Sequence, residues 1–111
     1  MEKQDVISAL AALAHETRLD VFRLLVQAGP VGMAAGAVAE ALHIPAATLS
    51  FHLKELRNAG LLAAHREGRS IRYAPDFDCM SALVGYLGEN CCQGGPCAER
   101  PRTAPARKET P

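Results

Sequence analysis

Apolar side chains recur three or four residues apart through the first quarter of the chain, a spacing that predicts two helices. The first helix is short, and its apolar positions are Val6, Leu10 and Leu13. The second is expected to begin at Thr17, whose hydroxyl is suited to cap a helix N-terminus, and to end at Gly29 and Pro30. Each helix carries one apolar face, so both are expected to contribute to one core.

Two more helical patterns cover residues 34–42 and 45–59. Pro45 is favoured in the first turn of a helix, and glycine, here Gly60, commonly follows a helix end. In the second of these helices Leu49, Leu53 and Leu56 recur on one face, which we expect to be buried. Two short helices this close together predict a helix-turn-helix.

From Leu61 onward the apolar pattern changes to the alternation that is typical of extended strands. Residues 61–76 therefore predict a β-hairpin with its turn near Glu67 and Gly68. A hairpin that directly follows a helix-turn-helix outlines a winged helix-turn-helix. The sequence thus predicts a mostly α-helical fold with one small β-hairpin.

A last helix is expected after Asp76, with apolar residues on one side. Together, the first and last helices hold more large apolar residues than the core of so small a domain needs. We expect these two helices to pack against a second copy in a homodimer, which would space two recognition helices for grooves about 34 Å apart. The residues concerned are Val6, Leu10, Leu13, Met80, Leu83, Val84 and Leu87.

The length of 111 residues and an apolar content of 49% indicate a single globular domain, which we assign to residues 1–97. Residues 98–111 contain three prolines and no large apolar residue, so we expect a disordered tail there. The polar N-terminus does not resemble a secretory leader, and no apolar stretch is long enough to span a membrane. We therefore expect a cytoplasmic protein with no membrane partner.

Positive charge is concentrated in the middle of the chain. The 12 basic and 12 acidic residues cancel overall, but residues 43–72 hold five basic residues against two acidic ones. This segment contains the predicted second helix of the helix-turn-helix and the hairpin. Basic residues on these elements suit contacts with DNA phosphates.

Three stretches, ALAHETRLDVFRLL, PAATLSFHLKELRNAGLL and REGRSIRY, resemble the ArsR/SmtB family of bacterial regulators, and the resemblance covers residues 5–97. It implies a homodimeric winged-helix repressor that leaves its double-stranded operator DNA when a metal or metalloid binds. Two ligand patterns of the family are missing. The helix over 34–42 lacks the Cys-Val-Cys pair, and no His follows His65 to complete a zinc site in the last helix.

The helix from Pro45 is expected to enter a major groove with its N-terminal residues near base edges. Hydroxyl groups can bond to bases or phosphates, a phenyl ring can touch a thymine methyl, and cations can bind phosphates. At the tip of the wing, Arg69 suits a narrow minor groove. His52 is expected to bond locally. The predicted DNA-binding residues are Thr48, Ser50, Phe51, Lys54, Arg57, Arg66, Arg69 and Arg72.

Three cysteines, Cys91, Cys92 and Cys97, lie within seven positions after the last helix. A Gly-Gly-Pro turn between the pair and the third residue can bring three thiolates to one point. Three soft ligands without a fourth suit a three-coordinate ion such as trivalent arsenic, As(III), or antimony, Sb(III). The fourth cysteine, Cys79, is expected to be a small core residue instead.

The leading interpretation is a repressor of an arsenic-resistance operon with As(III) as its inducer. A thiol redox sensor, and a repressor that responds to cadmium, lead or zinc, remain alternatives with the same DNA-binding half. A thiol enzyme such as an arsenate reductase is disfavoured. A nucleophilic cysteine needs a cationic or helix N-terminal setting, whereas these cysteines follow a helix end beside Glu89.

Overall fold

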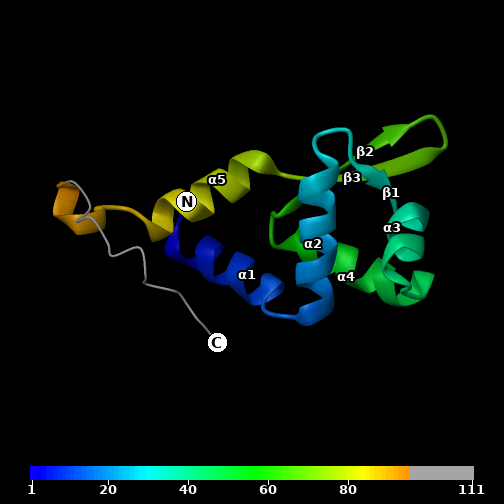
Figure 1. The fold of residues 1–111 in the computed structure, drawn as a ribbon, viewed down its shortest axis with the longest axis horizontal. Coiled ribbons are helices and arrows are strands. Elements are labelled where there is room, and N and C mark those ends of the chain that lie inside the picture. Colours follow the sequence, from blue (N-terminus) through cyan, green and yellow to red (C-terminus); the bar gives the residue numbers. More distant parts are fainter. Residues whose placement is uncertain (96–111) are drawn as a thin grey trace, which may run out of the picture.

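The computed structural model describes residues 1–95 of the chain. The predicted tail, Cys97 and the last residues of the predicted domain lie outside the described residues. The elements are α1 (Lys3–Leu13), α2 (Glu16–Ala28), β1 (Met33–Ala34), α3 (Ala35–Leu42), α4 (Ala46–Asn58), β2 (Leu62–Glu67), β3 (Ser70–Pro75), α5 (Phe77–Leu87) and the short 3-10 helix η1 (Cys91–Gly94). Figure 1 shows α1 and α5 at one end of the molecule, and α3 with the hairpin at the other. The predicted winged helix-turn-helix is confirmed.

The hairpin belongs to an antiparallel sheet of three strands in the order β1-β3-β2. Strand β1 pairs Met33 with Tyr73 and Ala34 with Arg72, so it holds the base of the wing through two residues only. The sequence pattern did not predict this strand, because two residues are too few to show an alternation. The base of the wing is thereby joined to the segment that follows α2.

The N-terminus of α2 differs from the sequence expectation in its capping residue. Thr17 does not cap the helix. His15 does: its backbone is extended, and its ring Nδ1 accepts a hydrogen bond of 3.2 Å from the backbone N–H of Thr17. A neutral imidazole nitrogen can satisfy a free helix N–H in the way that the expected hydroxyl does. The helix therefore starts one residue earlier, at Glu16.

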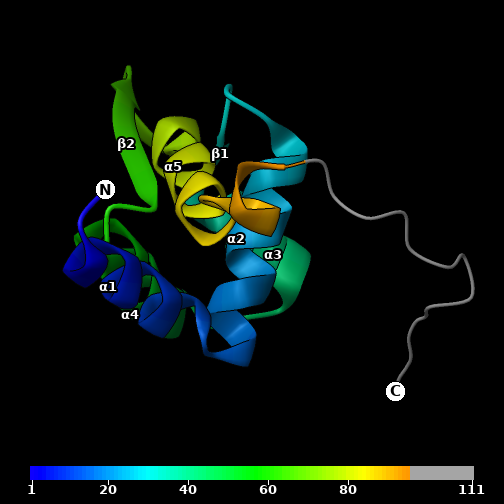
Figure 2. The same ribbon diagram turned by 90° about the vertical axis from the view of Figure 1, so that its left-hand side faces the viewer.

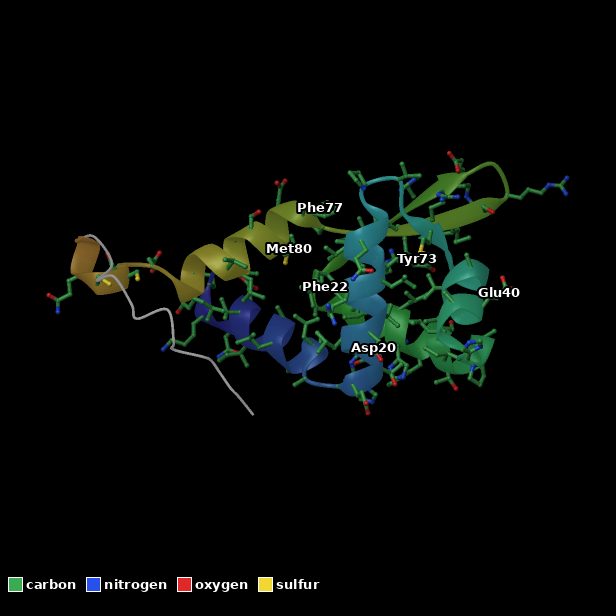
Figure 3. The ribbon with its side chains drawn as sticks, viewed as in Figure 1. Asp20, Phe22, Glu40, Tyr73, Phe77 and Met80 are labelled. Atoms are coloured by element: carbon green, nitrogen blue, oxygen red, sulfur yellow. The ribbon has the colours of Figure 1, made fainter. Side chains whose placement is uncertain are left out.

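The core surrounds α2 and the apolar face of α4. The largest fully buried side chains are Leu25, Leu49, Leu56, Leu61, Val21 and Val38. Phe22 on α2 and Met80 on α5 lie between α2 and α5, and both pack into the same cluster (Figure 3). This packing fixes α4 and the wing on one body.

Helices α1 and α5 lie side by side on the face that Figure 2 turns toward the viewer. Val6 and Leu83 point into the domain's own core and are only 4% and 6% exposed, so these two are not part of an unpartnered face. Other apolar residues of the same helices remain in solvent: Ile7, Leu10, Val84 and Leu87 are between 42% and 66% exposed. Within residues 1–95, no helix has the length and apolar character required to cross a membrane.

Candidate nucleic-acid interface

Helix α4 turns one face to the core and the opposite face to solvent. Its leucines at 49, 53 and 56 are at most 2% exposed, as their spacing predicted. The predicted contact residues of this helix are all on the solvent side, and they are Thr48, Ser50, Phe51, Lys54 and Arg57. Phe51 is 56% exposed, and its ring meets that of His52 edge-on, with 5.6 Å between the ring centroids. The helix thus offers hydroxyl, aromatic and cationic groups on one surface.

An open groove of about 500 Å³ lies between α4 and the hairpin. Its α4 wall contains Ser50, Lys54 and Arg57, and its far wall contains Tyr73 of β3. Asn58 also lines it, and sequence reasoning missed this residue although it follows Lys54 by one helical turn. Tyr73 belongs to the predicted hairpin, but its place beside α4 depends on how the hairpin packs against that helix, for which the local sequence has no signal. Two cations above a concave polar surface suit a nucleic-acid backbone.

The wing carries Arg66 on β2 and Arg69 in the turn, and both are exposed. Within the described part of the chain, neither side chain has a hydrogen bond or an ion pair. Their guanidinium groups are therefore available for a partner that carries negative charge. Predicted contacts of these two residues with DNA stay predictions.

Arg72 differs from the other predicted contacts. Its Nε donates to the carbonyl oxygen of Val31 at 3.0 Å, and its Nη2 donates to that of Gly32 at 2.8 Å. Its Nη1 lies 3.7 Å from Oε1 of Glu67, and only 27% of the side chain is exposed. The structure gives Arg72 an intramolecular role, and its predicted contact with DNA stays a prediction.

His52 faces inward from α4, as expected for a residue that bonds locally. It is 6% exposed, and its Nδ1 lies 3.3 Å from Nη1 of Arg18, which can donate only to a neutral ring. The same arginine donates through Nε to the carbonyl oxygen of Ala12 at 2.8 Å. Burial, followed by the nearby His15 and Arg18, lowers the pKa of His52, and Glu55 opposes this shift.

The cysteine segment leaves the end of α5 through a tight turn. Cys91 and Cys92 are exposed, and their Sγ atoms lie 3.7 Å apart. Asn90, Cys92 and Gln93 adopt positive φ angles between 53° and 58°, which bend the chain sharply beside the two sulfurs. Among residues 1–95, no three His, Cys, Asp or Glu side chains come together as a metal site. The predicted third ligand, Cys97, is outside this range.

Cys79 is separate from that pair. It lies in the first turn of α5, is half-buried and packs against the core, in agreement with its predicted role. Burial, then the carboxylates of Asp76 and Asp5, raise the pKa of the Cys79 thiol. A raised pKa disfavours the thiolate, which is the form that binds metals.

Comparison with known proteins identifies relatives of a large part of this chain. A family model described as a helix-turn-helix domain matches residues 13–64. The HTH-type transcriptional regulator YceK of Bacillus subtilis, itself uncharacterised, is 39% identical over 77 residues, which cover 68% of this chain and 76% of YceK.

Two solved structures are similar over most of their length. An ArsR-like transcriptional regulator from Rhodococcus sp. RHA1 superposes with a TM-score of 0.68 at 27% identity and covers 76% of each chain. The homodimeric winged helix-turn-helix DNA-binding domain of Mb0332 from Mycobacterium bovis is described as a possible ArsR-family regulator. It gives a TM-score of 0.64 at 29% identity, over 86% of this chain and 89% of that one.

Proposed function

Since this chain belongs to the ArsR/SmtB family of winged helix-turn-helix transcriptional regulators, we propose that it is a cytoplasmic repressor of an arsenic-resistance operon. In this proposal, trivalent arsenic or antimony binds Cys91, Cys92 and Cys97 and releases the protein from its operator. Regulators of this class bind DNA and are not enzymes, so the arsenate reductase hypothesis is dropped.

The operator is proposed to contact the solvent side of α4 and the wing. The exposed hydroxyls of Thr48 and Ser50 and the ring of Phe51 lie toward the N-terminal half of α4, where a recognition helix meets base edges. Lys54 and Arg57 border the groove beside the hairpin, where a phosphate backbone can run. Arg66 and Arg69 then extend the positive surface along the wing.

The repressor is proposed to act as a homodimer through α1 and α5. Ile7, Leu10, Val84 and Leu87 expose apolar side chains on these adjacent helices, although the domain has a complete core without them. A second copy that covers this face would remove the apolar surface from water. The Mycobacterium bovis relative is homodimeric, which supports this arrangement.

The observation that carries the inducer proposal is the pair of exposed sulfurs, Cys91 Sγ and Cys92 Sγ, at 3.7 Å from one another. Two soft donors at this separation are close enough to bind one thiophilic ion. Cys97, five residues after Cys92, supplies the third donor of a three-coordinate centre in this proposal. For the ion to cause release, it must bind the DNA-free form more tightly than the DNA-bound form.

The same proximity of two sulfurs favours a second candidate, a redox sensor in which oxidation of the thiols releases DNA. The two functions differ in their trigger. Arsenite acts on reduced thiols and needs no oxidant, whereas a redox sensor responds to peroxide and is reset by a thiol reductant. Both functions start from the same operator-bound protein, so one DNA-binding assay with arsenite or peroxide as the trigger separates them.

The test is release of a fluorescently labelled operator fragment, followed by anisotropy, during titration with arsenite under reducing conditions. We expect Cys91→Ser, Cys92→Ser and Cys97→Ser to bind the operator like the parent but to need at least about tenfold more arsenite for release, because a hydroxyl is a poor ligand for a soft ion. Cys79→Ser is the matched control and is expected to respond like the parent.

Release by peroxide but not by arsenite would select the redox sensor. Loss of the arsenite response in Cys79→Ser, with the response kept in Cys97→Ser, would show that the sensor lies further up α5. In either case the DNA-binding part of the proposal is unaffected.

A further inference from the structure

The wing is attached to the rest of the domain over a short distance. Strand β1 pairs with β3 at two residues, and this pairing is the only strand contact of the hairpin outside itself among residues 1–95. So short a ladder resists bending of the hairpin poorly, because few hydrogen bonds fix its angle. Burial of Leu62 and Ala74 holds the base of the hairpin against the core, whereas residues 65–71, nearer the turn, are exposed. Side-chain hydrogen bonds made beyond the buried base can therefore contribute to the position of the tip.

Arg72 lies at this base. It stands on β3 opposite Ala34 of β1 and His65 of β2, and its guanidinium reaches across to the loop that ends α2. There it donates to two successive carbonyl oxygens, Val31 O at 3.0 Å and Gly32 O at 2.8 Å. A planar guanidinium with two bonds in fixed directions holds an angle, which a single hydrogen bond does not.

We infer that Arg72 is a positioning residue: it locks the wing to the loop after α2 so that Arg69, at the tip, reaches the DNA. Arg72 does not contact the DNA itself. The inference rests on the proposed DNA interface, because it assigns Arg69 its contact there.

The distance from Arg72 to the tip makes the position of Arg69 sensitive to the hydrogen bonds of Arg72. Arg69 precedes Arg72 by three residues, which in an extended strand is about 10 Å. A tilt of roughly 10° at the base therefore moves the tip by about 2 Å, which is more than a hydrogen bond or a close phosphate contact tolerates. Arg69 has no intramolecular partner within the described residues to restore its place.

Electrostatics give a way to separate this role from a direct phosphate contact. Each lost phosphate contact lowers the slope of log affinity against log salt concentration by about one. Arg72→Lys keeps the charge but loses the two-pronged hydrogen bond, because an ammonium group is a single point donor. If Arg72 only supplied charge to a phosphate, this substitution would leave the slope unchanged.

The experiment measures operator affinity of the full chain at several salt concentrations for Arg72→Lys, Arg72→Gln, Arg69→Ala and the double variant Arg69→Ala/Arg72→Lys. We expect Arg72→Lys and Arg72→Gln to weaken binding equally, by about tenfold, although they differ by one charge. Both substitutions reduce the magnitude of the slope of log affinity against log salt concentration by about one per wing, as Arg69→Ala does. In the Arg69→Ala background, Arg72→Lys is expected to have no further effect.

Thermal unfolding of each variant accompanies the titrations, so that affinity is compared between folded proteins. If only one of the two single variants at Arg72 folds, that one is compared with Arg69→Ala. A merely structural residue would lower the melting temperature but would not abolish the effect of Arg69→Ala. The inference is overturned if Arg72→Lys binds like the parent while Arg72→Gln loses one unit of slope, or if the effects at 69 and 72 are additive.

Failure of the DNA interface itself gives a different result. In that case Arg69→Ala and Lys54→Ala would both leave the affinity and its salt dependence unchanged. If those two variants weaken binding and Arg72→Lys does not, the proposed interface stands and only the lock is wrong.

Discussion

Substitution of Gly32 by alanine tests how tightly the base of the wing is packed. Gly32 has a φ of +77°, and a β-carbon added to it would lie 2.5 Å from the carbonyl oxygen of Tyr73 and 3.0 Å from the carbonyl carbon. These are backbone atoms of the central strand, so they cannot move aside as the end of a side chain can. The same residue accepts the hydrogen bond from Arg72.

The expected loss of stability has two parts. A left-handed backbone conformation costs an alanine roughly 1–2 kcal/mol. Displacing β3 to relieve the clash adds about 1–3 kcal/mol, the usual range for overpacking. Gly60→Ala is the matched control, because Gly60 has a φ of +83° but no atom within 4 Å of its added β-carbon. It should lose only the first part.

The assay is thermal or urea unfolding of both variants at one protein concentration, since a dimer's stability depends on concentration. For a domain of this size each kcal/mol lowers the melting temperature by about 4–8 °C. Gly32→Ala is therefore expected to melt well below Gly60→Ala. Equal melting temperatures for the two variants would refute the close contact between the loop after α2 and β3.

Two further predictions concern His52, on the inner side of α4, and the proposed dimer. Because the pKa of His52 lies below its ordinary value of 6.5, the unfolded chain takes up this proton first. The contribution of His52 to the free energy of unfolding is therefore complete above pH 6.5 and is lost as the pH falls through the folded pKa; urea titrations from pH 5 to 8 should show a weaker pH dependence in His52→Asn. Val84→Glu should raise the dissociation constant of the dimer at least about tenfold in sedimentation experiments, because it puts a charge on the exposed α1–α5 face. Val31→Glu, at 67% exposure against 66%, is the control that should leave the dimer intact.

The spacing of apolar residues predicted the buried face of α4 and the hairpin correctly. The leucines of α4 are three or four residues apart and are buried, and the alternation after Leu61 became the hairpin with its turn between Glu67 and Ser70. These features are local, because an amphipathic helix or strand buries whichever face is apolar. They were sufficient to predict the winged helix-turn-helix.

Features that depend on two distant segments were missed. Strand β1 exists only because Met33 and Ala34 meet β3 some 40 residues later. On α5 the spacing could not decide between neighbouring residues: Leu83 packs inward, whereas Val84, one position on, is 66% exposed. The helix cap at His15 was missed because a ring nitrogen in the right place replaced the expected hydroxyl of Thr17.

Charge was the least readable property, because a sequence shows which residues are cationic but not which cations are already bound. Arg18 near the start of α2 donates to the carbonyl oxygen of Ala12 and contacts His52 of α4. Arg72 donates to the carbonyl oxygens of the loop that follows the end of α2. One arginine thus ties the recognition helix, and the other ties the wing, to opposite ends of the same central helix. The net positive charge of residues 43–72 therefore includes Arg72, a half-buried cation that already has intramolecular partners, and the other four cations lie exposed on α4 and the outer wing.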